Sequence, residues 1–182
     1  PLLGMLPMIE ESVLEKLGLE EGRLVRAFSD DSLHGFSESV RTLRTSLTLA
    51  GLEHSSKVVL LTSSVPGEGK TTTSANLAEA YGQMEKTLLI DADMRRPTMA
   101  KKLGLPHNSK GLSNAVAYPD TLEECIHHME ELNIDVIPSG PIPPNPLELL
   151  SSRNFEQLLD TLRGRYQRII IDSAPMRLVS DA

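Results

Sequence analysis

The chain has 182 residues, with 18 lysines and arginines against 25 aspartates and glutamates, so its formal net charge is −7 and its pI lies near 5.2. The length suits a single α/β domain, and the acidic balance argues against nucleic acid or anionic lipid as a partner. The single cysteine, Cys125, excludes an intramolecular disulfide, and no apolar run approaches the roughly 20 residues that a membrane-spanning helix needs.

The first 31 residues are predicted to form a segment that precedes the domain of residues 32–182. Residues 1–7 read as an extended or strand-like piece, and acidic, turn-rich sequence follows to about Asp31. From His34 to Ala50 a helix with one face packed on the domain is predicted, because apolar side chains recur at spacings of three and four: Phe36, Val40, Leu43, Leu47 and Ala50.

Strands and helices alternate along the rest of the chain. We expect strands at residues 58–62, 87–91, 134–137 and 168–172, and helices at 71–83, 98–103, 112–116 and 154–162. This alternation predicts an α/β fold with a mostly parallel sheet and helices on both faces. Residues 88–90 and 169–171 are continuously apolar, as strands buried on both faces are. The proline-rich stretch 138–146 is predicted to be a rigid loop.

A phosphate-binding loop is predicted at residues 64–71, Ser-Val-Pro-Gly-Glu-Gly-Lys-Thr, between a strand and a helix. Glycines in the loop let successive backbone N–H groups turn toward one anion, and the following helix adds the positive end of its dipole. Lys70 can then reach the β- and γ-phosphates of a nucleotide, and the Thr71 hydroxyl can bind Mg²⁺. The consensus pattern begins with glycine, where this chain has Ser64.

Aspartates close two of the apolar strands, at Asp91 and Asp172, and Asp93 follows shortly after the first. The carboxyl ends of parallel strands meet at one edge of a sheet, so these carboxylates are expected to converge on Lys70. Asp172 is predicted to hold Mg²⁺ together with Thr71, and Asp91 is a further candidate ligand. Asp91 is also the first candidate to deprotonate an attacking hydroxyl, and Asp93 is the second. A single strand-end aspartate is as often a turn former or a helix cap.

Arg95 and Arg96 follow these aspartates and could neutralise phosphate charge. Adjacent basic residues are usually solvated, so only Arg95 is assigned to the site. Glu68 is predicted to make a contact within the loop rather than to act in catalysis. The predicted nucleotide-binding residues are therefore Pro66, Gly67, Glu68, Gly69, Lys70, Thr71, Thr72 and Arg95.

Three stretches together resemble the Walker A, A′ and B motifs of bacterial tyrosine kinases: residues 66–71, 88–97 and 169–175. Residues 138–140, 143–150 and 179–182 look like the same family, and the resemblance extends from about Glu38 to the end. It implies a P-loop NTPase fold and a domain that uses MgATP to phosphorylate tyrosines in a tyrosine-rich tail. The three tyrosines present, Tyr81, Tyr118 and Tyr166, are not clustered, so that tail is expected beyond Ala182.

The resemblance also implies partners and a location. It implies the cytoplasmic domain of an inner-membrane protein, joined to a membrane-anchored region that is either fused or separate. Residues 1–7 resemble the segment that follows the second membrane span in fused members. The implied partners are the machinery that polymerises and exports capsular or extracellular polysaccharide and a cognate tyrosine phosphatase; nucleic acid is not among them.

Glu38, Arg41 and Arg44 match the family's E-x-x-R-x-x-R oligomerisation motif. Helical spacing places the three charges on one arc, while Val40 and Leu43 turn away. In an unknown protein this pattern would be a solvated face with an i,i+3 ion pair. The resemblance instead implies a ring-like homo-oligomer in which one copy phosphorylates another.

Two other functions stay open. A Min/Par-type ATPase switch shares this fold, but that class carries a signature lysine five residues before Lys70, where this chain has Val65. A nucleotide-responsive oligomerisation module without kinase activity would also account for the charged helix arc.

Overall fold

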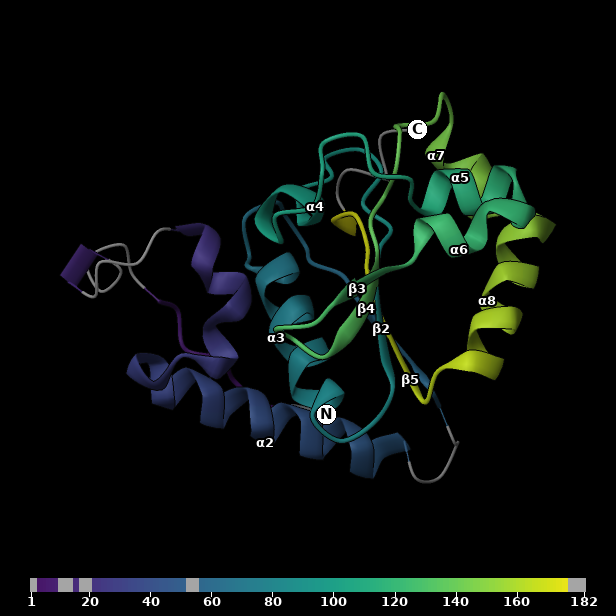
Figure 1. Cartoon of the computed structure of the whole chain (residues 1–182). Helices are drawn as coiled ribbons and strands as arrows, with labels where there is room; N and C mark the ends of the chain where they lie inside the picture. Colours follow the sequence, from purple (N-terminus) through teal and green to yellow (C-terminus); the bar gives the residue numbers. More distant parts are fainter. Residues whose placement is uncertain (1–2, 10–14, 17–20, 52–55, 177–182) are drawn as a thin grey trace.

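The sheet places the carboxyl ends of its central strands side by side. The computed structural model describes residues 3–9, 15–16, 21–51 and 56–176 (Figure 1). Among these residues, one five-stranded sheet has the order β1-β5-β2-β4-β3. Its strands are β1 (Val58–Leu61), β2 (Thr87–Asp91), β3 (His127–Met129), β4 (Ile134–Ile137) and β5 (Arg168–Asp172). All neighbours pair in parallel except β3, which runs antiparallel to β4.

Helices cover both faces of this sheet, as predicted. On one face lie α2 (His34–Gly51) and α3 (Lys70–Gly82), and on the other lie α5 (Leu112–Ala117), α6 (Leu122–Cys125) and α8 (Arg153–Arg165) (Figure 1). Alternate residues of β2 supply the two cores: Leu89 packs with α3, while Leu88 and Ile90 pack with α5 and α8. The predicted two-sided burial of the central strands is therefore confirmed.

Strands β2, β4 and β5 have the predicted bounds, and the predicted helices agree to within a few residues. Besides the 3-10 helices η1 (Glu21–Ser29), η2 (Asp31–Leu33) and η3 (Pro119–Thr121), one strand and two α-helices in the described part were not predicted: β3, α6 and α7 (Pro146–Leu150). The sequence of β3 has no apolar alternation, and α6 spans only four residues. Helix α7 begins at the last proline of the predicted loop, because Pro146 takes the first helical position and Asn145 caps it by accepting from the Glu148 N–H.

Part of the segment before α2 is helical, although its sequence is rich in turn formers. Residues 3–7 form no strand, but η1 (Glu21–Ser29) packs against α3 and buries Val25 and Phe28. Asn76, in the middle of α3, binds the backbone of this segment on both sides. Its Oδ1 accepts from the Phe28 N–H at 2.7 Å, and its Nδ2 donates to the Leu24 carbonyl at 2.7 Å. The division at residue 31 stays a prediction, but this contact ties the segment to the helix that follows the phosphate loop.

None of the helices in the described part of the chain has the length and hydropathy of a membrane span.

We expect Glu79→Gln to change how stability depends on pH. Glu79 is 2% exposed on α3 and accepts a hydrogen bond from the Ser29 hydroxyl. Burial raises its pKa above the ordinary value of 4.5, against the opposing effects of Ser29 and the Arg26 charge. The folded protein thus holds this proton more tightly than the unfolded chain, so the free energy of unfolding falls as pH rises from 4.5 through the raised pKa.

Glutamine keeps an acceptor for Ser29 and cannot ionise, so the variant should lose this decline above the ordinary carboxyl pKa. Urea unfolding at a series of pH values measures it, with the exposed Glu156→Gln on α8 as the control. An equal decline in the wild type and in Glu79→Gln would show that another group is responsible.

Candidate nucleotide site

The loop between β1 and α3 has the backbone of a phosphate cradle. Gly67 and Gly69 have φ values of 85° and 77°, a left-handed conformation that favours glycine. Gly69 precedes the first residue of α3, and no side chain of a described residue caps that helix. The first N–H groups of α3 therefore remain available to an anion. Asn133 is the one non-glycine residue with positive φ in the described part, so Ser64 occupies its position without strain.

Glu68 shapes the loop, in agreement with its expected role. Its carboxylate Oε2 accepts from the backbone N–H of Ser64 at 2.8 Å and of Val65 at 3.2 Å. The side chain thus closes the loop onto its own beginning.

Asp172 lies at the centre of the site and is 1% exposed. One carboxylate oxygen accepts from Lys70 Nζ at 2.7 Å, and the other accepts from Thr71 Oγ1 at 2.7 Å. Ser74 Oγ donates to the first oxygen at 3.3 Å. Lys70 Nζ also lies 3.8 Å from Asp93 Oδ2, so one ammonium group forms ion pairs with two carboxylates. Of the three aspartates expected to converge on Lys70, Asp93 and Asp172 therefore lie within ion-pair distance of its ammonium group.

Asp91 neighbours Asp172 in the register of β2 and β5 and is also 1% exposed. Its Oδ1 accepts from the Asp93 N–H at 3.0 Å, while its buried Oδ2 has no hydrogen-bond partner among the described residues. Burial, together with the nearby Asp172 carboxylate, raises the pKa of Asp91 to about 7. Asp91 can therefore exchange a proton near neutral pH.

These oxygens fit a magnesium ion. Mg²⁺ prefers oxygen ligands and takes only one or two protein groups beside water and phosphate. The Thr71 hydroxyl and the Asp172 carboxylate supply such groups, and the unpartnered Oδ2 of Asp91 supplies a third close by. A larger cluster of three or more acidic, histidine or cysteine ligands is not found in the described part of the chain.

A cleft of about 250 Å³ opens over the loop. Its lining includes Arg96 and Lys102, the latter from α4 (Met99–Lys102), whereas the exposed Arg95 is not part of it. The prediction that Arg95 rather than Arg96 belongs to the site is therefore not supported by the cleft lining. Asp93 Oδ1 accepts from the Arg96 N–H at 3.1 Å, and the sequence does not predict this turn closed by a side chain.

A larger hollow, of about 480 Å³, lies near Asp135 at the end of the sheet where the parallel strands begin. The larger volume therefore does not identify the nucleotide site.

The three predicted oligomerisation residues have different surroundings. Arg41 and Glu38 form an exposed ion pair, and the Arg41 guanidinium lies 5.1 Å from the centre of the Phe28 ring. Arg44 instead donates to the Ala80 carbonyl at 2.6 Å and holds α2 against the end of α3. Assembly through these residues stays a prediction, and Arg44 has a role within its own subunit.

The phosphate loop, the aspartates at the strand ends and the mostly parallel sheet together define a P-loop nucleotide-binding domain. Residues 56–180 match a family model described as an AAA domain. The chain is 42% identical over 147 residues to tyrosine-protein kinase YwqD of Bacillus subtilis (strain 168), which covers 80% of this chain and 62% of that protein. It is 35% identical to the solved kinase domain of Escherichia coli tyrosine kinase ETK, with a TM-score of 0.84, covering 100% of this chain and 72% of that one.

The chain therefore belongs to this AAA-domain family and to the kinase domains of the bacterial tyrosine kinases, which confirms the resemblance and the fold class. It spans about three fifths of the length of YwqD. The septum site-determining protein MinD from Pyrococcus horikoshii OT3, complexed with Mg-ADP, is a more distant neighbour. It is 28% identical with a TM-score of 0.54, covering 64% of this chain and 48% of that one.

We expect Lys70→Met to lower nucleotide turnover by at least about a hundredfold, because it removes the charge near the transferred phosphate and leaves the loop backbone intact. Thr71→Ala should mainly raise the Mg²⁺ concentration that turnover requires. ADP release measures both effects, and the exposed Lys101→Met on α4 is the control. Turnover at the parent rate in Lys70→Met would show that the site is assigned wrongly.

Proposed function

We propose that the chain is the catalytic domain of an ATP-dependent protein-tyrosine kinase that transfers the γ-phosphate of MgATP to a tyrosine on another copy. The observation that carries this proposal is the cluster of buried polar side chains at the carboxyl ends of β5 and β2. Asp172 binds Lys70 and Thr71 there, beside an Asp91 carboxylate with one unpartnered oxygen. The similarity to the tyrosine kinases YwqD and ETK supports the same activity.

The loop N–H groups and the beginning of α3 would bind the phosphates. Lys70 would exchange Asp172 for β- and γ-phosphate oxygens, while Thr71 and Asp172 hold the magnesium ion. When bound, Mg²⁺ neutralises the negative charge of these phosphate oxygens. Arg96 lines the same cleft, so it is placed better than Arg95 to contribute positive charge.

Asp91 would accept the proton of the acceptor hydroxyl. The tyrosine oxygen forms a bond to the γ-phosphorus, the bond from that phosphorus to the bridging oxygen of ADP breaks, and ADP leaves with the electron pair. A carboxylate with a pKa near 7 suits this task, because at neutral pH a substantial fraction of it is ionised and that fraction is basic enough to take the proton. Asp93, which contacts Lys70 and, unlike Asp91, lines the cleft, is the second candidate.

Intact-mass analysis with MgATP and an added tyrosine peptide tests the activity. Kinase function predicts that the peptide gains the mass of one phosphoryl group. ADP without transfer would favour the Min/Par-type switch, which the MinD likeness supports and Val65 opposes. Neither product would favour an oligomerisation module, and both of these outcomes would contradict the kinase proposal.

The wider setting is also a proposal. We infer a ring-like homo-oligomer whose subunits phosphorylate one another, attached to a membrane-anchored region that is fused or separate, at the cytoplasmic side of an inner membrane. Its partners would be polysaccharide polymerisation and export machinery and a tyrosine phosphatase. The motif match at Glu38, Arg41 and Arg44 supports the self-association.

We expect Asp91→Asn to lower phosphoryl transfer more than ATP binding, since the carboxylate acts on the acceptor hydroxyl. A loss of transfer of about 10²–10⁴-fold is typical for a general base. Single-turnover transfer and equilibrium binding of MgADP measure the two effects separately. If nucleotide binding fell more than transfer, Asp91 would be a nucleotide or metal ligand first.

We expect the double substitution Glu38→Ala with Arg41→Ala to reduce self-association while the fold persists. A desolvated interface pair can contribute a few kcal/mol, whereas an exposed pair contributes under about 1 kcal/mol. The matched control is Asp160→Ala with Arg163→Ala, another exposed i,i+3 pair. Light scattering over a range of protein concentrations measures the effect, and an unchanged oligomer would contradict it. Arg44→Ala should in addition lower stability, because it loses its bond to Ala80.

A further inference from the structure

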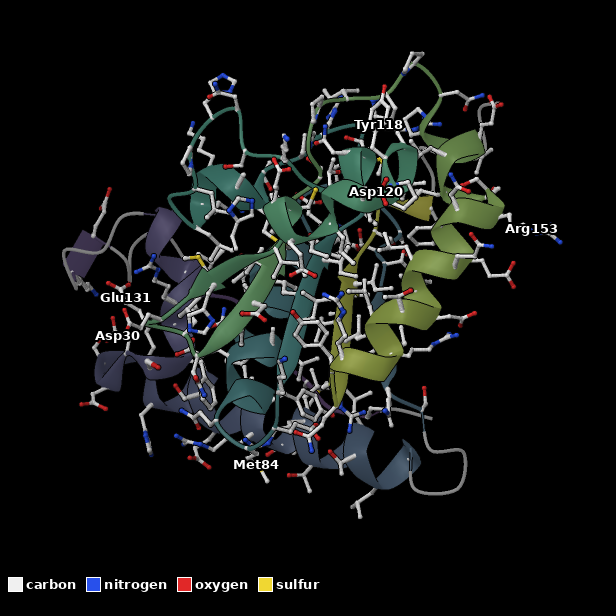
Figure 2. The ribbon with its side chains drawn as sticks, turned by 45° about the vertical axis from the view of Figure 1, so that its right-hand side comes forward. Asp30, Met84, Tyr118, Asp120, Glu131 and Arg153 are labelled. Carbon is white, nitrogen blue, oxygen red and sulfur yellow. The ribbon has the colours of Figure 1, made fainter. Side chains whose placement is uncertain are left out.

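The three tyrosines of the chain differ sharply in accessibility. Tyr81 is 2% exposed and donates to the Arg44 carbonyl, and Tyr166 is 4% exposed and donates to Asp135 at 2.6 Å. Tyr118, after α5, is 67% exposed, and Figure 2 shows it at the surface close to Asp120. Its hydroxyl has no hydrogen-bond partner among the described residues. Only Tyr118 of the three can present its hydroxyl to another protein without unfolding.

The backbone around Tyr118 is fixed. Its N–H donates to the Asn114 carbonyl at 2.7 Å, and its carbonyl accepts from the Thr121 N–H at 2.9 Å and from the Thr121 hydroxyl at 2.7 Å. Tyr118 does not line the nucleotide cleft of its own subunit. Tyr118 thus offers an exposed side chain on a hydrogen-bonded backbone outside its own cleft, where a second copy can bind it.

The surroundings of Tyr118 are acidic. Asp120, Glu123 and Glu124 follow within six residues and are exposed, with no basic residue between them and Tyr118. Glu123 and Glu124 pair with Arg165 and Lys110. Asp120 forms no ion pair with any described residue, so its charge is available to a partner.

The cleft carries the opposite charge. Residues 94–119 contain five lysines and arginines and no acidic residue, although the chain as a whole has a net charge of −7. Two of these cations, Arg96 and Lys102, line the cleft over the phosphate loop, and neither forms an ion pair with a described residue. Met99 and Leu103, both buried, anchor α4 and so fix the base of Lys102. The cleft thus presents cations without an ion-pair partner among the described residues. The segment that follows Tyr118 presents a carboxylate without one, that of Asp120.

We propose that Tyr118 is a phosphorylation site: it enters the nucleotide cleft of a second copy, where Lys102 binds the Asp120 carboxylate. This inference rests on the proposed kinase function. The Tyr118 oxygen forms a bond to the γ-phosphorus, the bond to the bridging oxygen of ADP breaks, and the proton passes to Asp91 of the second copy. The site therefore prefers acceptor tyrosines that are followed by an acidic residue.

The test mixes the wild-type chain and MgATP with a mass-tagged Lys70→Met chain as the acceptor, and an added neutral tyrosine peptide reports kinase activity in the same tube. Fragmentation mass spectrometry should find phosphate on Tyr118 of the tagged copy and none on Tyr81 or Tyr166. Transfer to the peptide without transfer to Tyr118 would overturn this inference and leave the kinase function standing. Transfer to neither acceptor would overturn both.

Charge variants test the recognition step. Asp120→Asn in the acceptor, or Lys102→Gln in the enzyme, should each slow Tyr118 phosphorylation about two- to fivefold, with the larger effect at low ionic strength. Lys101→Gln is the matched control, because Lys101 is exposed on the same helix but lies outside the cleft lining. Rescue of Asp120→Lys by Lys102→Glu would establish the direct pairing. Equal rates for Lys101→Gln and Lys102→Gln, or no effect of Asp120→Asn, would contradict the pairing.

Discussion

The buried carboxylate of Asp172 is the interaction on which the site depends. It closes the central strand β5, and its two oxygens hold the first two residues of α3, Lys70 and Thr71. A carboxylate with 1% exposure is costly unless it is paired and hydrogen-bonded, so the end of β5 and the beginning of α3 must stay together. The loop between β1 and α3 is thereby confined to a short path, which its two left-handed glycines allow.

The same arrangement explains the chemistry at the neighbouring strand. Asp91 lies beside Asp172 in the β2–β5 register, so a second carboxylate is buried next to a first. Lys70 forms its ion pairs with Asp172 and with Asp93. Burial and like charge raise the pKa of Asp91 to about 7. A divalent cation beside Thr71 and Asp172 would offset this repulsion, which couples metal binding to the protonation of the proposed base.

The sequence predicted what depends on local pattern. Continuous apolar runs ending in aspartate located β2 and β5, and the carboxyl-end rule brought Asp91 and Asp172 together. The sequence could not predict features that depend on single hydrogen bonds between residues far apart in the chain. The packing of η1 rests on Asn76 and Glu79 reaching residues about 50 positions away, and the position of Arg96 in the cleft depends on a turn made by Asp93. Arg44 fits the assembly motif in sequence, yet it binds Ala80 of its own subunit.

Calorimetric titration with ADP tests the central role of Asp172 most directly, in Mg²⁺ and in EDTA, for the wild type and for Asp172→Asn. The exposed Asp160→Asn on α8 is the control. The account predicts that Mg²⁺ strengthens ADP binding to the wild type and to the control, and that Asp172→Asn loses most of this gain while it still binds metal-free ADP. An equal gain from Mg²⁺ in Asp172→Asn and in the wild type would contradict the account.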